Sequence, residues 1–130
     1  MKTHEIETRI LAEQATAAMF NTLTAEEMAD WLPRAFREVA TYLSRLGAGP
    51  AGPPYARYRR LDEERFEVEA GFPASAPVQE TGEIRPSQLP PCRAAVVEHV
   101  GPYDTLLEAY GALVEWLARH EKQTVGDPWE

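Results

Sequence analysis

The chain has 130 residues, one cysteine and a formal net charge of −8. This length suits one compact domain, and the acidic excess argues against non-specific binding to nucleic acid, which requires Lys and Arg to neutralise phosphates. The lone Cys92 cannot form an internal disulfide, and no apolar run could cross a bilayer or form a signal peptide, so we expect a cytoplasmic protein without a membrane partner.

The first part of the chain predicts two strands followed by helices. Extended segments are expected from His4 to Ile10 and from Gln14 to Thr22. Thr24-Ala25-Glu26-Glu27 then has the pattern of a capping box, so a helix begins there. The ring of Pro33 would clash inside a helix, and we therefore expect a second helix from Pro33 to Leu46 rather than one long helix.

The middle of the chain predicts a β-hairpin. Gly47 to Pro54 forms a stiff loop, after which strands are expected from Tyr55 to Arg60 and from Arg65 to Ala70, joined by Leu61 to Glu64. Alternation along the second strand separates an apolar face from an acidic one. The apolar face has Phe66, Val68 and Ala70, and the acidic face has Glu67 and Glu69.

The last third predicts a crossover and a second strand–helix unit. Phe72 to Pro91 is rich in Pro, Ser and Gly, as expected for a crossover. Arg93 to Val100 follows as a strand, Gly101 to Asp104 as a turn and Thr105 to His120 as a helix.

The chain also repeats itself. Residues 5–19 align with 83–97, and residues 35–55 align with 109–129. A duplication of this kind predicts two equivalent halves, about residues 3–71 and about residues 80–130, related by a pseudo-two-fold axis with a cleft at their seam. We therefore expect a single α+β domain over residues 1–130: a duplicated β-α-β-β antiparallel sheet with two main helices on one face and a central ligand groove.

Four motifs in this order resemble the GyrI-like small-molecule-binding domain, which also occurs as the effector-binding domain of AraC-type and MerR-type multidrug-responsive regulators. They are Arg65-Phe66-Glu67-Val68-Glu69-Ala70-Gly71-Phe72-Pro73, Leu89-Pro90, His99-Val100-Gly101-Pro102-Tyr103 and Pro128-Trp129-Glu130. The resemblance implies a groove between the halves, lined by aromatic rings and at least one buried acid. It also implies multidrug binding, with ligands that are bulky, flat and often cationic, because ring faces and carboxylates both attract cations.

Two departures from the family pattern affect the expectations. The family's last motif continues into a tyrosine and a short strand, whereas this chain ends at Glu130, so we expect that strand to be cut short. An unpaired sheet edge could recruit a second chain, which makes a dimer the alternative to the expected monomer. No helix-turn-helix segment is apparent, so direct DNA binding is not expected.

The resemblance and the aromatic residues together give the candidate site. Glu130 stands at the family's functional acid position, and Glu69 could add negative potential at the groove. Trp31, in a short helix without a counterpart, is a candidate lid. Core packing is the alternative role for the rings, above all for Tyr110. The aromatic candidates are Trp31, Tyr55, Tyr58, Phe72, Tyr103, Tyr110, Trp116 and Trp129.

The sequence favours binding over catalysis. It has no second histidine or cysteine at metal-ligand spacing beside His99, no nucleophile elbow and no phosphate loop, so we expect neither a metal nor a cofactor. The leading hypothesis is stand-alone binding of flat cationic or amphipathic molecules, for sensing or sequestration. One alternative is a hydrolase that opens cyclopropane rings of DNA-alkylating natural products, with Glu130 and Tyr103 or Tyr58 activating water. Another is a DNA gyrase inhibitor-like protein whose acidic surface mimics DNA.

Overall fold

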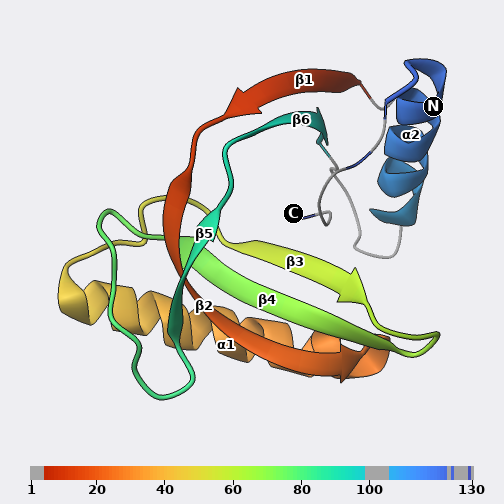
Figure 1. Ribbon diagram of the computed structural model, residues 1–130. Helices are drawn as coiled ribbons and strands as arrows, with labels where there is room; N and C mark the ends of the chain where they lie inside the picture. The colour runs from red at the N-terminus through yellow and green to blue at the C-terminus, as the bar shows by residue number, and fades with distance from the viewer. Residues whose placement is uncertain (1–4, 99–105, 123, 125–128, 130) are drawn as a thin grey trace. The chain divides into compact units, whose positions relative to one another are not determined.

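A computed structural model of the protein describes residues 5–98, 106–122, 124 and 129 (Figure 1). These residues form antiparallel strands and two α-helices, which confirms the predicted α+β class. They belong to two compact units, one comprising Met1–Ala12 with Pro91–Val125 and the other Glu13–Pro90 with Gly126–Glu130. The elements are β1 (Ile6–Leu11), β2 (Gln14–Thr24), α1 (Ala25–Leu46), β3 (Tyr55–Arg60), β4 (Arg65–Pro73), β5 (Arg85–Leu89), β6 (Cys92–Val97) and α2 (Leu106–Arg119).

The smaller unit is built on one antiparallel ladder between β1 and β6. Its register runs from Ile6 opposite Val97 to Leu11 opposite Cys92. Helix α2 packs on both strands and buries Ala109. The predicted strand and helix of the second repeat therefore correspond to β6 and α2.

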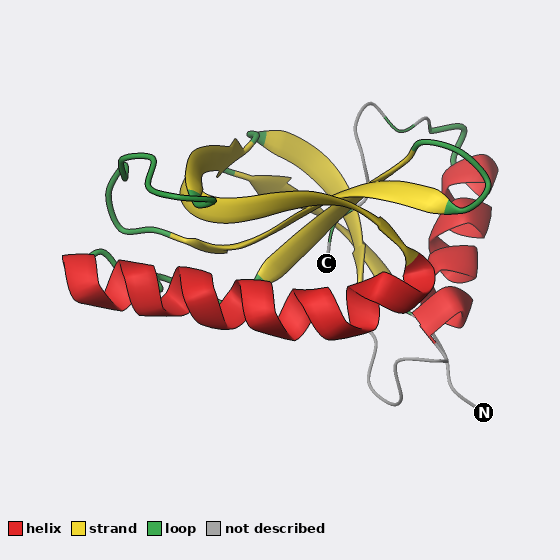
Figure 2. Ribbon diagram, turned by 90° about the horizontal axis from the view of Figure 1, so that it is seen from below, coloured by secondary structure: helices red, strands yellow, loops and turns green. Residues whose placement is uncertain are grey.

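In the larger unit, four strands form an antiparallel sheet in the order β3-β4-β2-β5. β4 pairs with β3 on one side and with β2 on the other, and β2 in turn pairs with β5. Helix α1 packs on β2 and β4 and runs along one face of this sheet (Figure 2). Because successive strand residues point to opposite faces, the sheet presents one set of side chains to α1 and another to the opposite side.

Helix α1 is continuous from Ala25 to Leu46, so the prediction that a second helix begins at Pro33 is wrong. Its N-terminus has the predicted capping box. Thr24 Oγ1 accepts a hydrogen bond from the Glu27 amide at 3.3 Å, and Glu27 Oε1 accepts one from the Thr24 amide at 2.9 Å. Gly47 ends the helix in the left-handed conformation, with φ at 66°.

Pro33 is accommodated because its ring lies on the exposed side of α1, where the carbonyl that it leaves without a partner can bind water. On the opposite side, Trp31, Ala35, Val39 and Leu43 recur at every fourth residue and are all buried. The buried stripe continues on both sides of the proline, and its contacts with the sheet outweigh the loss of one backbone hydrogen bond.

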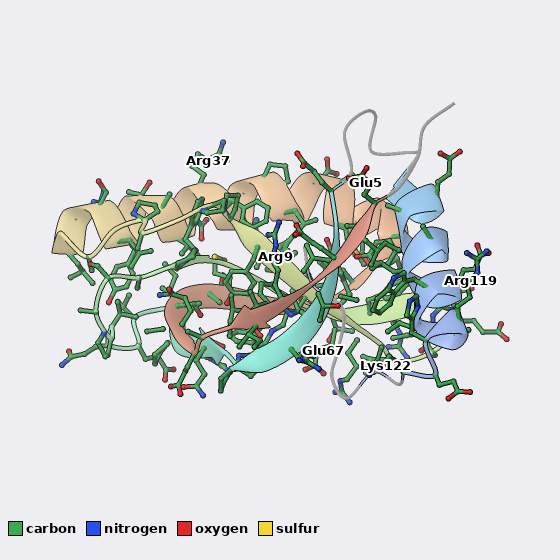
Figure 3. The ribbon with its side chains drawn as sticks, turned by 90° about the horizontal axis from the view of Figure 1, so that it is seen from above. Glu5, Arg9, Arg37, Glu67, Arg119 and Lys122 are labelled. Atoms are coloured by element: carbon green, nitrogen blue, oxygen red, sulfur yellow. The ribbon has the colours of Figure 1, made fainter. Side chains whose placement is uncertain are left out.

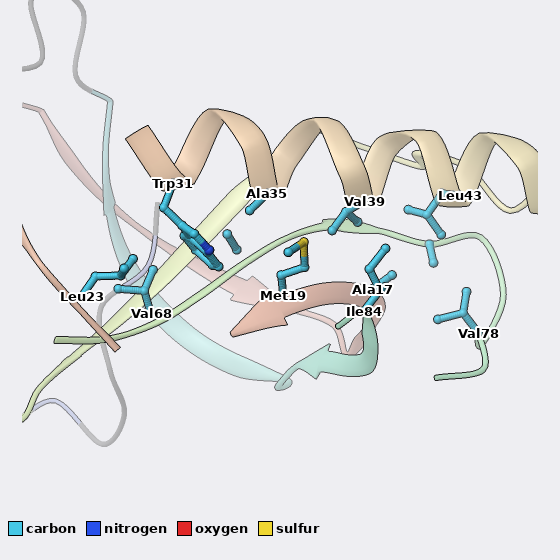
Figure 4. Packing of buried hydrophobic residues seen from close by; sticks show 12 residues of the cluster. Ala17, Met19, Leu23, Trp31, Ala35, Val39, Leu43, Val68, Val78 and Ile84 are labelled. Carbon is cyan, nitrogen blue, oxygen red and sulfur yellow. The ribbon is translucent and has the colours of Figure 1, made fainter. Parts of the chain in front are cut away.

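The main core lies between α1 and the sheet (Figure 4). Trp31 is only 6% exposed and packs in this core, so the hypothesis that it acts as a lid is wrong. On the outer side of α1, Arg37 points away from the sheet (Figure 3). The buried members of the cluster are Ala17, Met19, Leu23, Trp31, Ala35, Val39, Leu43, Val68, Ala70, Ala74, Val78 and Ile84.

The strands depart from the prediction in two respects. The expected single sheet is, among the described strands, a two-stranded and a four-stranded sheet. The expected crossover from Phe72 to Pro91 contains β5, which pairs with β2. Pro90 and Pro91 have no amide hydrogen to donate, which explains why β5 ends at Leu89 and a new strand begins at Cys92. The pseudo-two-fold axis and the central groove stay predictions.

Of the two described helices, neither combines the length and the apolar character needed to cross a membrane.

Close approach of β4 to β2 requires a glycine at position 71. Gly71 pairs with Ala18 on one side and with Tyr55 on the other. A Cβ atom at Gly71 would lie 2.2 Å from the backbone oxygen of Ala17 and 2.9 Å from the Cβ of Ala18. Both are parts of a paired strand that cannot yield as a flexible side chain would, so only glycine fits this position.

We predict that Gly71→Ala lowers the free energy of unfolding by about 3 kcal/mol or more, because the new methyl group overpacks the β2–β4 ladder. Gly111→Ala in α2 is the matched control, since a Cβ atom there has nothing within 4 Å. We expect that control to stabilise the protein by about 0.5–1 kcal/mol. Urea unfolding followed by circular dichroism measures both, and an unchanged stability of the Gly71 variant would contradict the close approach.

Candidate functional site

Polar and aromatic side chains meet on the sheet face opposite α1, which we call the site face. Val68 and Ala70 of β4 are buried in the core beneath α1, so Glu67 and Glu69, which alternate with them, point to the other side, as the alternation predicted. The strands contribute Thr16, Ala18 and Phe20 from β2, Tyr55, Arg57 and Arg59 from β3, Glu67 and Glu69 from β4, and Ser87 and Leu89 from β5.

Glu69 is the buried charge of the site face, with 8% of its surface exposed. Its Oε1 accepts hydrogen bonds from Arg57 Nε at 3.1 Å and from Arg57 Nη2 at 2.7 Å. Its Oε2 accepts from the Tyr55 hydroxyl at 2.6 Å and from Ser87 Oγ at 2.8 Å. A carboxylate offers about four lone-pair positions, so these donors satisfy the group completely while Arg57 balances its charge.

Tyr55 links this carboxylate to β2. Its hydroxyl donates to Glu69 and lies 2.9 Å from Thr16 Oγ1, and both Tyr55 and Thr16 are buried. Since the phenolic proton goes to the carboxylate, the Thr16 hydroxyl must be the donor in the second bond. Burial, and then the bond to Glu69, raises the pKa of Tyr55 above its ordinary value, so this side chain remains a neutral donor.

The turn between β3 and β4 determines which residue stands opposite Glu69. Asp62 Oδ1 accepts hydrogen bonds from the backbone amides of Glu64 at 2.9 Å and Arg65 at 2.8 Å. The bond from the Glu64 amide, followed by that from the Arg65 side chain, lowers the pKa of Asp62. This turn fixes a register in which Arg57 lies directly opposite Glu69.

A second Arg–Glu pair lies one step along the same strands and differs in burial. Arg59 Nη2 lies 2.5 Å from Glu67 Oε2, and the two side chains are 56% and 47% exposed. In the Arg57–Glu69 pair, the side chains are 25% and 10% exposed. Solvent screens the outer pair, Arg59–Glu67, whereas the inner pair, Arg57–Glu69, lies in a less polar environment where its electrostatic interaction is stronger.

Two hollows open beside the inner pair. The larger has a volume of about 600 Å³, and its lining includes Thr16, Arg57, Ser87 and Gln88. The smaller has a volume of about 170 Å³, and its lining includes Arg57, Glu69 and the ring of Phe20. Arg57 therefore borders both hollows and is the charged side chain that they share.

Trp129 provides an aromatic side chain at the same face. It forms an isolated antiparallel bridge with Arg57 at the edge of β3. Its half-buried side chain packs against a small cluster of Ala18, Tyr55 and Leu89. The larger unit thus places a tryptophan, a tyrosine and a buried acid in one neighbourhood.

The predicted site residues separate into distinct groups. Tyr55, Glu69 and Trp129 meet at the site face, as just described. Trp31, Tyr58 and Phe72 instead pack with the core on the α1 side, where Phe72 makes an edge contact with Phe36 at 6.0 Å between ring centres. Tyr58 therefore points to the opposite face of the sheet from Glu69, whereas Tyr55 donates a hydrogen bond to it.

The remaining candidates are in the smaller unit or outside the described residues. Tyr110 and Trp116 belong to α2, and Trp116 stacks on His120 with 4.2 Å between ring centres. Tyr103, Glu130 and the motif residue His99 lie outside the described residues. Their proposed roles stay predictions.

Sequence reasoning missed Arg57, Thr16 and Ser87. The available signal was the alternation of β3. It places Tyr55 and Arg57 on one face of that strand, which can pair with the acidic face of β4 on the same side of the sheet. No sequence pattern indicated Thr16 or Ser87, because their contacts depend on how strands distant in the sequence pair: Thr16 meets Tyr55 through the pairing of β2 and β3 with β4, and Ser87 meets Glu69 through the pairing of β5 with β2. Within the described residues, no three His, Cys, Asp or Glu side chains are placed to hold a metal ion.

We predict that Tyr55→Phe lowers the free energy of unfolding at pH 7 by about 1.5–3 kcal/mol, because the variant loses a hydrogen bond to a buried charge. The difference should shrink as the pH rises above about 10, the ordinary pKa of tyrosine. In that range the unfolded wild-type chain has lost the Tyr55 proton while the folded chain still holds it, so the wild type loses stability.

Urea unfolding of both proteins at neutral pH and through the alkaline range measures this effect. Stability curves that stay parallel above about pH 10 would show that folding does not raise the pKa of Tyr55.

Comparison with known proteins places the chain in a family. The fold is similar to the crystal structure of the EcmrR C-terminal domain, with a TM-score of 0.77 and 18% identity over 98% of this chain and 83% of that one. It is also similar to EcmrR in the cryo-EM structure of an EcmrR–DNA complex, with a TM-score of 0.80 and 18% identity over 97% of this chain. The chain spans about half, 48%, of that EcmrR chain. No curated protein matches the sequence significantly. The family model of the GyrI-like small-molecule-binding domain matches residues 11–128, and the chain therefore belongs to the GyrI-like family.

Proposed function

We propose that this protein binds flat, amphipathic and often cationic small molecules at the site face, in a sensing or sequestering role. The family supports small-molecule binding in general. The observation that carries the finer statement is the buried carboxylate of Glu69, which lies beside Tyr55 and lines the smaller hollow. The proposal requires no contact with DNA by this domain.

The aromatic and apolar side chains around Glu69 favour a flat ligand body. Trp129 is half-buried over Tyr55 and Leu89, and Phe20 is a large apolar side chain that remains 39% exposed. Ring faces bind flat molecules by stacking, which tolerates many outlines, and they attract positive charge. Such a surface selects for planarity and charge rather than for one hydrogen-bond pattern.

The carboxylate favours positive charge because it is held in a low-dielectric setting. Glu69 is supported by donors from two other strands, Tyr55 on β3 and Ser87 on β5, so it is fixed in place. A fixed, buried charge interacts with a ligand cation more strongly than an exposed one. Glu67, on the same strand but half-exposed, is expected to contribute little.

We predict that Glu69→Gln weakens binding of 9-aminoacridinium, a flat cation with N–H donors, by about tenfold and leaves binding of acridine, its flat neutral counterpart, almost unchanged. Tryptophan fluorescence quenching measures both affinities, with Glu67→Gln as the control for a charge change on the same strand. Equal losses for the two ligands would contradict a charge role for Glu69. Glu130→Gln, measured in parallel, tests whether Glu130, which stands at the family's functional acid position, contributes to the affinity for the cation.

Incubation of the protein with a reactive ligand separates binding from hydrolysis. We expect the mass of a cyclopropane-bearing DNA alkylator to be unchanged after incubation with the protein, as measured by mass spectrometry. A catalytic increase in mass by one water would instead establish the hydrolase alternative, since water adds across the opened ring.

A further inference from the structure

The carboxylate of Glu69 has no vacant acceptor position for a ligand. Arg57 donates twice to Oε1, and the Tyr55 and Ser87 hydroxyls donate to Oε2. These bonds use the lone pairs that a carboxylate offers. A cationic ligand can therefore bind to Glu69 directly only if one of the present donors leaves.

Arg57 is the donor that a ligand cation can replace, because it is the one of the three donors that carries a positive charge. Tyr55 is buried and also bound to Thr16, whereas the Arg57 side chain is 25% exposed and borders both hollows. Apart from Glu69, its guanidinium contacts the backbone oxygen of Gln88 through a long bond of 3.3 Å. A long side chain at the edge strand of the sheet can turn into solvent without disturbing the ladder.

We propose that Arg57 is an internal competitor for the cation site, and that a ligand cation binds Glu69 by displacing the Arg57 guanidinium from Oε1. This inference rests on the proposed function, because it assumes that cations bind at Glu69. The exchange replaces one positive charge by another, so the carboxylate of Glu69 has a cationic partner both before and after the ligand binds. The apparent affinity for the ligand equals the intrinsic affinity multiplied by the fraction of molecules in which Arg57 has left Oε1 of Glu69.

The geometry also selects the class of cation. Nε and Nη2 of Arg57 are two N–H donors on one planar group, and both bind the same oxygen. An amidinium or guanidinium ligand reproduces this arrangement, whereas a quaternary ammonium group has no N–H to donate. The smaller hollow, about 170 Å³ and bordered by Phe20, is close to the size of an engineered cavity that holds one benzene ring, about 150 Å³. A benzamidinium-type ligand combines these features.

Calorimetric titration with benzamidinium and with the neutral benzamide tests the exchange. We expect Arg57→Gln to bind benzamidinium about tenfold or more tightly than the wild type, and benzamide with unchanged affinity. Arg59→Gln is the matched control, because it removes the same charge from the same strand at the exposed pair. Arg57→Lys retains the charge with a less complementary donor, so its affinity for benzamidinium should lie between those of the wild type and Arg57→Gln, and it carries the test if the glutamine variant fails to fold.

The outcomes separate this inference from the proposed function. If Arg57→Gln or, in its place, Arg57→Lys binds benzamidinium no more tightly than Arg59→Gln, Arg57 is not a competitor, while cation binding that depends on Glu69 stands. If Glu69→Gln leaves cation affinity unchanged in both the wild-type and the Arg57→Gln background, the proposed role of Glu69 fails, and the inference fails with it.

Discussion

The arrangement of the larger unit depends on the need to satisfy one buried carboxylate. Glu69 on β4 receives donors from Arg57 and Tyr55 on β3 and from Ser87 on β5, and Tyr55 in turn bonds Thr16 on β2. All four strands of the sheet thus supply a member of one network. A shift of one residue in any pairing would turn that member toward α1 and leave the charge without a partner. A buried ion pair adds little net stability, but separating its partners is costly, so the pair disfavours the neighbouring registers and reinforces the one that the β3–β4 turn sets.

The features that the sequence predicted correctly are governed by short-range rules. The capping box of Thr24 and Glu27 and the alternation along β4 involve residues a few positions apart, so local geometry determines them. Pro33 was misjudged because the rule against proline in helices is also local, whereas the buried stripe of α1 that overrides it depends on the sheet. In the same way, β5 was missed because its Pro and Ser residues form a strand only by pairing with β2.

The candidate site shows the same division between local and long-range information. Residue type and family resemblance name Tyr55, Glu69 and Trp129 as candidates but do not name Arg57, because its pairing with Glu69 depends on the register of the hairpin. The expected connection of Leu61 to Glu64 would place Arg60 opposite Arg65. In the structure, the Leu61 amide instead bonds the oxygen of Arg65, and Arg60 stands opposite Phe66. That difference of one residue decides whether Arg57 meets Glu69 or points toward the core.

The charge of the whole chain and the charge of the site are separate quantities. The chain carries a net charge of −8, yet the centre of the site face is a balanced pair of one carboxylate and one guanidinium. Long-range attraction of cations therefore arises from exposed acids and falls with salt, whereas discrimination at the centre is short-range and resists screening. A neutral, fully bonded centre surrounded by exposed rings such as Phe20 also lets the face remain folded while empty. Under the proposed function, selectivity then depends on which cations can replace a guanidinium, and breadth depends on how loosely the rings define the outline of the ligand.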